Sequence, residues 1–131
     1  MAKNTKDSFV VDTSFVLAFL LSDEKSDAVV DLFERYIRSE IVIYTTTLLR
    51  YELANALRSA VLRKRCTKKQ AEDFYTAFTL LDIAEISVDM RRCLALSLEK
   101  NISCYDASYL LLSKRKHATL LTFDKALKAT V

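Results

Sequence analysis

The chain has 131 residues, with 20 Lys and Arg against 17 Asp and Glu, and 51% of its residues are hydrophobic. This length and composition are typical of one globular domain and exclude a disordered chain. The sequence contains no Gly and no Pro, which excludes P-loops, dinucleotide-binding fingerprints and nucleophile elbows, because each needs Gly where the backbone turns sharply or approaches a ligand. We therefore expect a single domain over residues 1–131, with turns built from Asn, Asp, Ser, Thr and Lys.

Short apolar strands alternate with helices in the first half of the chain. The predicted elements are a strand at 8–11, a helix at 15–21, a helix from Ser26 or Asp27 to 39, a strand at 41–44 and a long helix at 48–65. Thr13 or Ser14 is expected to cap the first helix, and the three threonines at 45–47 the long one.

The second half continues the same alternation. Its predicted elements are a helix to 79 that opens with a Thr67/Gln70 capping box, a strand at 81–86, a helix from Ser87 to 99, a helix at 105–116, a strand at 118–122 and a short helix from Asp124. This pattern predicts an α/β domain of three layers. Its short, mostly parallel sheet has four to five strands, is covered by helices, and has strand 8–11 at its centre.

The cysteine and histidine content restricts the cellular compartment and the metal chemistry. The three cysteines, Cys66, Cys93 and Cys104, contain no Cys-x-x-Cys pair, and His117 is the only histidine. This set favours the reducing cytoplasm and makes a poor zinc site. A metal would therefore be a hard cation bound by oxygen. The longest apolar run, 9–21, is too short to span a membrane, so we expect no membrane association.

One carboxylate interrupts that apolar run. Asp12 is the only charged residue between Phe9 and Leu21, and an ionised carboxylate in apolar surroundings costs several kcal/mol unless it is compensated. Asp12 and Asp124 each follow a predicted strand closely, and ligands of parallel sheets bind at the carboxyl ends of strands. The sequence therefore predicts two carboxylates at that edge.

Glu52 and Asp106 are two further acids beside apolar stripes, early in predicted helices. Taken singly, each acid has an ordinary interpretation: a solvated helix residue for Glu52, a charge on the helix dipole for Asp106, and a helix cap for Asp124. Taken together, four crowded carboxylates repel one another unless a cation neutralises them. Mg²⁺ or Mn²⁺ would do so, and such sites activate water for the hydrolysis of phosphodiesters.

A basic segment follows Glu52. Residues 48–69 hold seven Lys and Arg against one acid. A segment of this kind binds the backbone of a nucleic acid or is a solvated helix end, and composition alone does not separate the two. The predicted RNA-binding residues are Arg58, Arg63, Lys64, Arg65, Lys68 and Lys69.

The segments around the four acids resemble, in order, the four acidic motifs of PIN-domain ribonucleases, most closely those of VapC-type toxins of toxin–antitoxin pairs. They are Val11–Ser14, Tyr51–Leu57, Tyr105–Leu110 and Leu121–Asp124. The resemblance extends from about residue 8 to 127. It implies a PIN-like fold and a metal-dependent endoribonuclease that uses Mg²⁺ or Mn²⁺ on structured RNA, is inhibited by a cognate antitoxin protein, and forms a homodimer.

The resemblance also implies roles for individual residues. Asp12, Glu52, Asp106 and Asp124 match the catalytic, metal-binding acids. The residues that match supporting positions are Thr13, Ser14, Asn55 and Thr122. Phe123 stands where a small residue is more usual in the family.

Two other functions are compatible with parts of this pattern. A non-catalytic PIN-like module that binds RNA or protein would keep the fold without useful metal affinity. A phosphoacceptor receiver domain has a similar size, but it needs paired acids at the end of the first strand, and Asp12 has no such neighbour.

Overall fold

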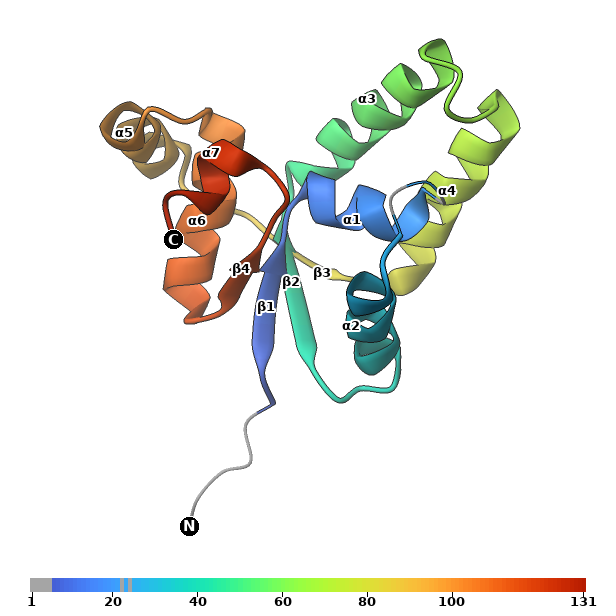
Figure 1. The fold of residues 1–131 in the computed structure, drawn as a ribbon. Helices are drawn as coiled ribbons and strands as arrows, with labels where there is room; N and C mark the ends of the chain where they lie inside the picture. Colours follow the sequence, from blue (N-terminus) through green and yellow to red (C-terminus); the bar gives the residue numbers. More distant parts are fainter. Residues whose placement is uncertain (1–5, 22, 24) are drawn as a thin grey trace.

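The computed structural model describes residues 6–21, 23 and 25–131. Four parallel strands form one sheet in the order β3–β2–β1–β4 (Figure 1). The strands are β1 (Ser8–Val11), β2 (Val42–Thr46), β3 (Ala84–Ile86) and β4 (Thr119–Leu121). The predicted α/β class is confirmed, and the central place of β1 puts the segment after it, which begins with Asp12, in the middle of the carboxyl edge.

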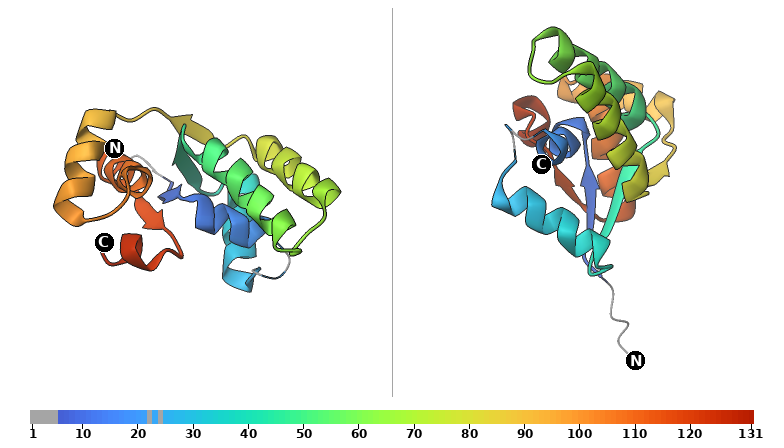
Figure 2. Two further views of the ribbon diagram at one scale, coloured as in Figure 1. Left: turned by 90° about the horizontal axis from the view of Figure 1, so that it is seen from above. Right: turned by 90° about the vertical axis from the view of Figure 1, so that its right-hand side faces the viewer.

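The helices form a layer on each side of the sheet. They are α1 (Thr13–Leu20), α2 (Asp27–Ile37), α3 (Leu49–Leu62), α4 (Lys68–Leu81), α5 (Met90–Lys100), α6 (Cys104–Lys116) and α7 (Lys125–Lys128). Figures 1 and 2 show α1 to α4 on one side of the strands and α5 to α7 on the other, with α3 and α4 extending beyond the sheet as a hairpin.

The core lies between these layers and is made of fully buried aliphatic and aromatic side chains. Val10 and Val11 of β1 are 0% exposed, as are Phe33 of α2, Leu53 of α3 and Leu112 of α6. Both faces of β1 are therefore covered, which explains its continuous apolar sequence.

Truncating a core side chain is expected to destabilise the fold strongly. Leu112→Ala removes fully buried methyl groups and leaves a cavity, so we expect a loss of about 2–5 kcal/mol in the free energy of unfolding. Leu98→Ala, on the exposed side of α5 where Leu98 is 76% exposed, is the matched control and should change stability by less than about 0.5 kcal/mol. Urea denaturation of both variants checks the difference.

Two predicted caps are wrong. Asp12, not Thr13 or Ser14, caps α1, and its carboxylate accepts the N–H of Phe15. A carboxylate directly after a strand already lies in the extended conformation that a cap needs, so the helix begins at Thr13, two residues earlier than predicted.

The threonines at 45–47 do not cap α3 either. Thr45 and Thr46 complete β2, and Leu48 occupies the cap position without a side-chain hydrogen bond. Their β-branched side chains favour the strand. Thr45 Oγ1 also donates to the carbonyl of Val11 at 2.8 Å, which ties β2 to the end of β1.

The third strand is shorter than predicted. Leu81 ends α4, Asp82 turns the chain in a left-handed conformation, and only Ala84–Ile86 pair with β2. Asp89, not Ser87, then caps α5 by accepting the N–H of Arg91. The apolar residue Leu81 fits either element, and its packing against the core selects the helix.

Without glycine, other residues must adopt left-handed backbone conformations. They are Ser39, Lys64, Asp82, Asn101 and His117, with φ between 51° and 60°. Asp82, Asn101 and His117 stand at the C-caps of α4, α5 and α6. The helices therefore end in the usual left-handed turn, but the Cβ atoms of these residues make that conformation less favourable than it is for glycine.

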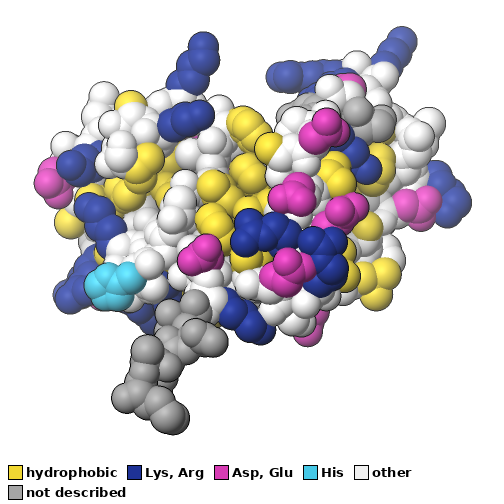
Figure 3. All heavy atoms as spheres, turned by 60° about the horizontal axis from the view of Figure 1, so that its bottom comes forward, with side chains coloured by type: hydrophobic (Ala, Val, Ile, Leu, Met, Phe, Trp, Pro, Cys, Tyr) yellow, Lys and Arg dark blue, Asp and Glu magenta, His cyan; other side chains and the backbone are white. Residues whose placement is uncertain are grey.

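The amino-terminal edge of the sheet lies opposite the end at which Asp12 follows β1. Figure 3 shows hydrophobic side chains across the middle of this face, with Lys, Arg, Asp and Glu side chains around them. A hollow of about 810 Å³ at this edge is lined by Phe19, Tyr36, Ile37 and Leu80 among others.

None of the helices in the described part of the chain has the length and apolar character of a membrane crossing.

Candidate active site

Four acids meet at the carboxyl edge of the sheet, each at the beginning of a helix. Asp12 caps α1 and Asp124 caps α7, while Glu52 and Asp106 lie in the first turns of α3 and α6. Burial first, and then the charges of Asp124, Glu52 and Asp12, raise the pKa of Asp106, as expected for acids at one edge of the sheet. We call these four residues the acid cluster.

Hydrogen bonds fix the most buried member of the acid cluster. Asp12 is 3% exposed. Its Oδ1 accepts from Ser14 Oγ at 2.7 Å and from the N–H of Phe15 at 3.0 Å, and its Oδ2 accepts from Thr122 Oγ1. Burial raises the pKa of Asp12, and these three bonds lower it in part. The protein itself thus supplies some of the compensation that the sequence led us to expect from a metal alone.

Ser14 and Thr122 connect the two capping acids. Ser14 Oγ lies 3.3 Å from Thr122 Oγ1 and accepts the N–H of Phe123 at 2.9 Å. Thr122 Oγ1 accepts the N–H of Asp124 at 2.9 Å. The hydroxyls therefore join the ends of β1 and β4 and set the position of Asp124 relative to Asp12.

Glu52 is oriented by two hydroxyl groups. Tyr109 OH donates to its Oε1 at 2.6 Å, and Thr13 Oγ1 donates to the same atom at 3.2 Å. Burial raises the pKa of Glu52, these two bonds lower it, and the charge of Asp12 raises it further. Both bonds reach Oε1, so they hold the carboxylate in place from one side.

Sequence reasoning missed Tyr109. It is 1% exposed and resembles a core residue, and burial beside Glu52 raises its pKa above the usual range, so it is a protonated donor at neutral pH. The signal available in the sequence is its spacing, because residues three apart lie on the same helix face and Tyr109 follows Asp106 by three.

Removing the Tyr109 hydroxyl is expected to weaken the site without unfolding the protein. In Tyr109→Phe, Glu52 keeps only the bond from Thr13, so its pKa should rise and its orientation should loosen. We expect the RNA cleavage that the family resemblance implies to fall about tenfold, and the acidic limb of its pH profile to move to higher pH. Cleavage rates across pH check this, and an unchanged profile would contradict the role of the hydroxyl.

Helix dipoles offset part of the crowding. The four acids occupy helix starts, where the backbone carries partial positive charge, and this favours their ionised form. The effect does not cancel burial and repulsion at Asp106. There burial first, and then the charges of Asp124, Glu52 and Asp12, raise the pKa to about 6.

The donor set fits a hard divalent cation in its chemistry. The site offers carboxylate and hydroxyl oxygens, which Mg²⁺ and Mn²⁺ prefer. Three of its four acids have a raised pKa, mainly because they are buried and in smaller part because the other acids repel their charge. Within residues 6–21, 23 and 25–131, no three acidic, Cys or His side chains form a group that could hold a metal ion as they stand.

Two parts of the predicted site lie elsewhere. Asn55 is exposed on α3 and, in the described part of the chain, makes no hydrogen bond to the acid cluster. The basic residues lie toward the far end of the α3–α4 hairpin (Figure 1), since at 1.5 Å per residue Arg63 is about 16 Å along the helix from Glu52. The assignment of RNA contacts to these residues stays a prediction, and the length of α3 separates those at its end from Glu52.

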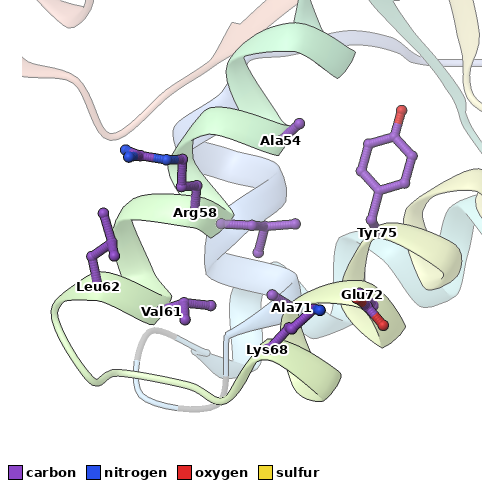
Figure 4. Close-up of a pocket in the computed structure, with 9 residues that line it drawn as sticks. Ala54, Arg58, Val61, Leu62, Lys68, Ala71, Glu72 and Tyr75 are labelled. Carbon is purple, nitrogen blue, oxygen red and sulfur yellow. The ribbon is translucent and has the colours of Figure 1, made fainter.

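Several of these basic residues have local partners. Arg65 forms an ion pair with Asp23 at 3.1 Å, and Lys69 one with Asp73 at 3.2 Å. Arg58 and Lys68 line an apolar groove of about 460 Å³ between α3 and α4 (Figure 4). The remaining lining residues are Ala54, Leu57, Val61, Leu62, Ala71, Glu72 and Tyr75.

Comparison with known proteins gives consistent matches. A family model described as PIN domain matches residues 9–131. Ribonuclease VapC3 of Pyrobaculum aerophilum is 29% identical over 122 residues, which cover 90% of each chain. The crystal structure of PAE2754 from Pyrobaculum aerophilum has a TM-score of 0.76 at 20% identity, covering 95% of this chain and 80% of that one.

A second solved structure matches over nearly its whole length. Mycobacterium tuberculosis VapC20, described as a sarcin-ricin loop cleaving toxin, has a TM-score of 0.64 at 18% identity, covering 93% of this chain and 94% of that one. At these identities the two structures support the fold.

Proposed function

This chain belongs to the PIN-domain family, and from that premise we propose that it is a VapC-type ribonuclease toxin that hydrolyses RNA with a divalent cation bound by the acid cluster. The observation that supports the proposal most strongly is the meeting of four acids from four helix starts at one edge of the sheet. Among the described residues no three His, Cys, Asp or Glu side chains form a group that could hold a metal ion as they stand, so the assignment of the cation to the acid cluster is supported by the chemistry of its carboxylates.

We assign Asp12, Glu52, Asp106 and Asp124 as the residues that would hold Mg²⁺ or Mn²⁺. When bound, such an ion lowers the pKa of water and offsets negative charge on the phosphate. Ser14 and Thr122 orient Asp12, while Thr13 and Tyr109 orient Glu52. The protein thus holds its carboxylates in place before substrate binds. Groups fixed in advance stabilise a transition state better than groups that must first be ordered.

Removing the cation tests this function directly. We expect a chelator to abolish cleavage of RNA by the purified protein, and excess Mg²⁺ or Mn²⁺ to restore it. Cleavage is measured on a labelled structured RNA, with the Asp12→Asn variant prepared in parallel to exclude a contaminating nuclease. Full activity in the presence of the chelator would contradict the proposal.

The proposal extends to partners and location. We infer a cognate antitoxin protein, a homodimer and a cytoplasmic location, with residues 1–131 acting as one domain. The three free cysteines fit a reducing compartment.

The apolar groove between α3 and α4 offers a surface for a partner protein. We assign RNA contacts to the basic residues around the hairpin turn, which include Arg63, Lys64 and Lys68.

A second candidate is a non-catalytic module that binds RNA or protein. The observation in its favour is that the described acids do not form a group that could hold a metal ion as they stand. Calorimetric titration with Mn²⁺ separates the two functions. Binding that is lost in Glu52→Gln supports the ribonuclease, and no binding at millimolar metal supports the module.

A further inference from the structure

Only three of the thirteen aromatic residues are exposed, and each directly precedes a member of the acid cluster. Tyr51 precedes Glu52 and is 71% exposed, and Tyr105 and Phe123, before Asp106 and Asp124, are 50% and 53% exposed. The other ten aromatic side chains are buried or half-buried. The most exposed aromatic side chains are thus the ones that directly precede these acids in the sequence.

Tyr51 stands at a hollow where the carboxyl ends of β2 and β3 meet. The hollow has a volume of about 300 Å³ and is lined by Thr47, Arg50, Tyr51 and Glu85. The N–H of Thr47 donates to the carbonyl of Ile86, the last residue of β3, at 3.2 Å, which places the hollow at the sheet edge. It therefore combines one aromatic ring with polar groups, one residue away from Glu52.

The polar wall of this hollow is formed by an ion pair between Arg50 and Glu85. Arg50 donates to both carboxylate oxygens of Glu85, from Nε at 2.9 Å and from an Nη at 2.6 Å. This paired arrangement orients the guanidinium, which lines the same hollow as the Tyr51 ring. A planar guanidinium and an aromatic ring are both surfaces on which nucleobases stack.

Phe123 and Tyr105 are held at the same edge by other contacts. Phe123 stacks on Phe15 with ring centroids 5.3 Å apart and an angle of 6° between the planes. The carbonyl of Tyr105 accepts from Ser108 Oγ at 2.6 Å, and that hydroxyl lies 3.4 Å from Thr46 Oγ1 at the end of β2. Both residues are thus anchored at the carboxyl edge while their rings remain half exposed.

We propose that Tyr51, Tyr105 and Phe123 are base-stacking residues around the acid cluster, and that the hollow beside Tyr51 is a nucleobase subsite. The inference rests on the proposed ribonuclease function and adds the residues that bind the bases next to the cleaved phosphate. Stacking on an exposed ring tolerates any base, whereas the Thr47, Arg50 and Glu85 groups add hydrogen bonds to a base edge.

The test measures binding without cleavage. The full chain is titrated, in the presence of a chelator, against a hairpin RNA that carries 2-aminopurine in its loop, because stacking quenches the fluorescence of that base. We expect Tyr51→Leu to weaken binding roughly tenfold and to reduce the quenching. Tyr51→Phe keeps the ring and should retain both. Leu98→Ala, an exposed apolar residue on α5, is the control for general surface effects.

The outcomes separate this inference from the proposed function. Equal binding and quenching by wild type, Tyr51→Leu and Phe123→Leu would overturn the base-stacking inference, even if the protein cleaves RNA with Mg²⁺. Quenching that depends on Tyr51, in a protein that never cleaves RNA with any divalent cation, would retain the subsite and contradict the ribonuclease. Wild-type affinity for RNA in Tyr51→Leu, with loss of binding to a protein partner, would assign the rings to that partner and also overturn the inference.

Discussion

Replacing Asp12 by Asn should lower the rate of RNA cleavage by at least about 100-fold while the protein remains folded. The amide keeps an oxygen that accepts from Ser14 and from the N–H of Phe15, so it still caps α1. What is lost is the negative charge at the centre of the acid cluster, which the proposed cation needs. Burial of that charge costs free energy, so the melting temperature should stay constant or rise by a few degrees.

The matched control is Asp31→Asn, because Asp31 is an exposed acid on α2, away from the acid cluster. It should cleave RNA like the wild type. Cleavage rates and thermal melts of the two variants, measured side by side, decide the matter. A folded Asp12→Asn variant with more than about a tenth of wild-type activity would exclude Asp12 from the catalytic machinery.

Without a cation, the protein should become less stable as the pH rises from about 4 to about 6. Asp106 has an ordinary pKa of 3.8 and a folded pKa of about 6. In this range the folded state therefore binds more protons than the unfolded state, and the free energy of unfolding falls with pH. Above pH 6 the full cost is present. Asp12 and Glu52 shift in the same direction.

Asp106→Asn removes the free-energy cost of ionising a partly buried carboxylate at position 106. The shift corresponds to less than about 3 kcal/mol, and solvent screening of a partly exposed carboxylate reduces the expected gain to about 1 kcal/mol at pH 7 in a chelator. That gain corresponds to a rise of about 4 °C in melting temperature. Mg²⁺ should then stabilise the wild type more than the variant, because the variant has one repelling charge fewer.

Asp27→Asn is the control for this experiment, since Asp27 also lies in the first turn of a helix but outside the acid cluster. It should show the wild-type dependence on pH and on Mg²⁺. Thermal melts from pH 4 to 8, with and without Mg²⁺, check the prediction. A stability of the metal-free wild type that rises steadily over this range would contradict it.

The sequence predicted the acids and the central strand because their signals are local. A charge directly after an apolar strand, as at Asp12, must lie at the carboxyl edge of a parallel sheet whatever the details of packing. The resemblance of four motifs, in order, to those of one family then predicted that Glu52 and Asp106 lie at the same edge. These predictions needed only the element order, which alternating hydrophobicity specifies well.

The remaining features depend on three-dimensional packing. Tyr109 could be recognised as a partner of Glu52 only once α3 and α6 had been placed next to β1. The basic residues Arg63 and Lys64 follow Glu52 closely in sequence, yet a straight helix carries them far from it. The exposure of Tyr51, Tyr105 and Phe123 depends on how the neighbouring elements pack around their side chains. Their sequence does not distinguish them from the aromatic residues that are buried.

The left-handed helix ends have a consequence for the balance of conformational entropy. Each non-glycine residue in that conformation costs about 1 kcal/mol in the folded state, and less for Asp82 and Asn101. Glycine there would give the unfolded chain more conformations to lose, at a cost of about 0.4–1 kcal/mol. The two costs nearly cancel at Asp82 and Asn101. At Lys64 the strain in the folded state is larger than the entropy that glycine would cost. The left-handed turn at Lys64 is therefore a net loss of stability relative to glycine.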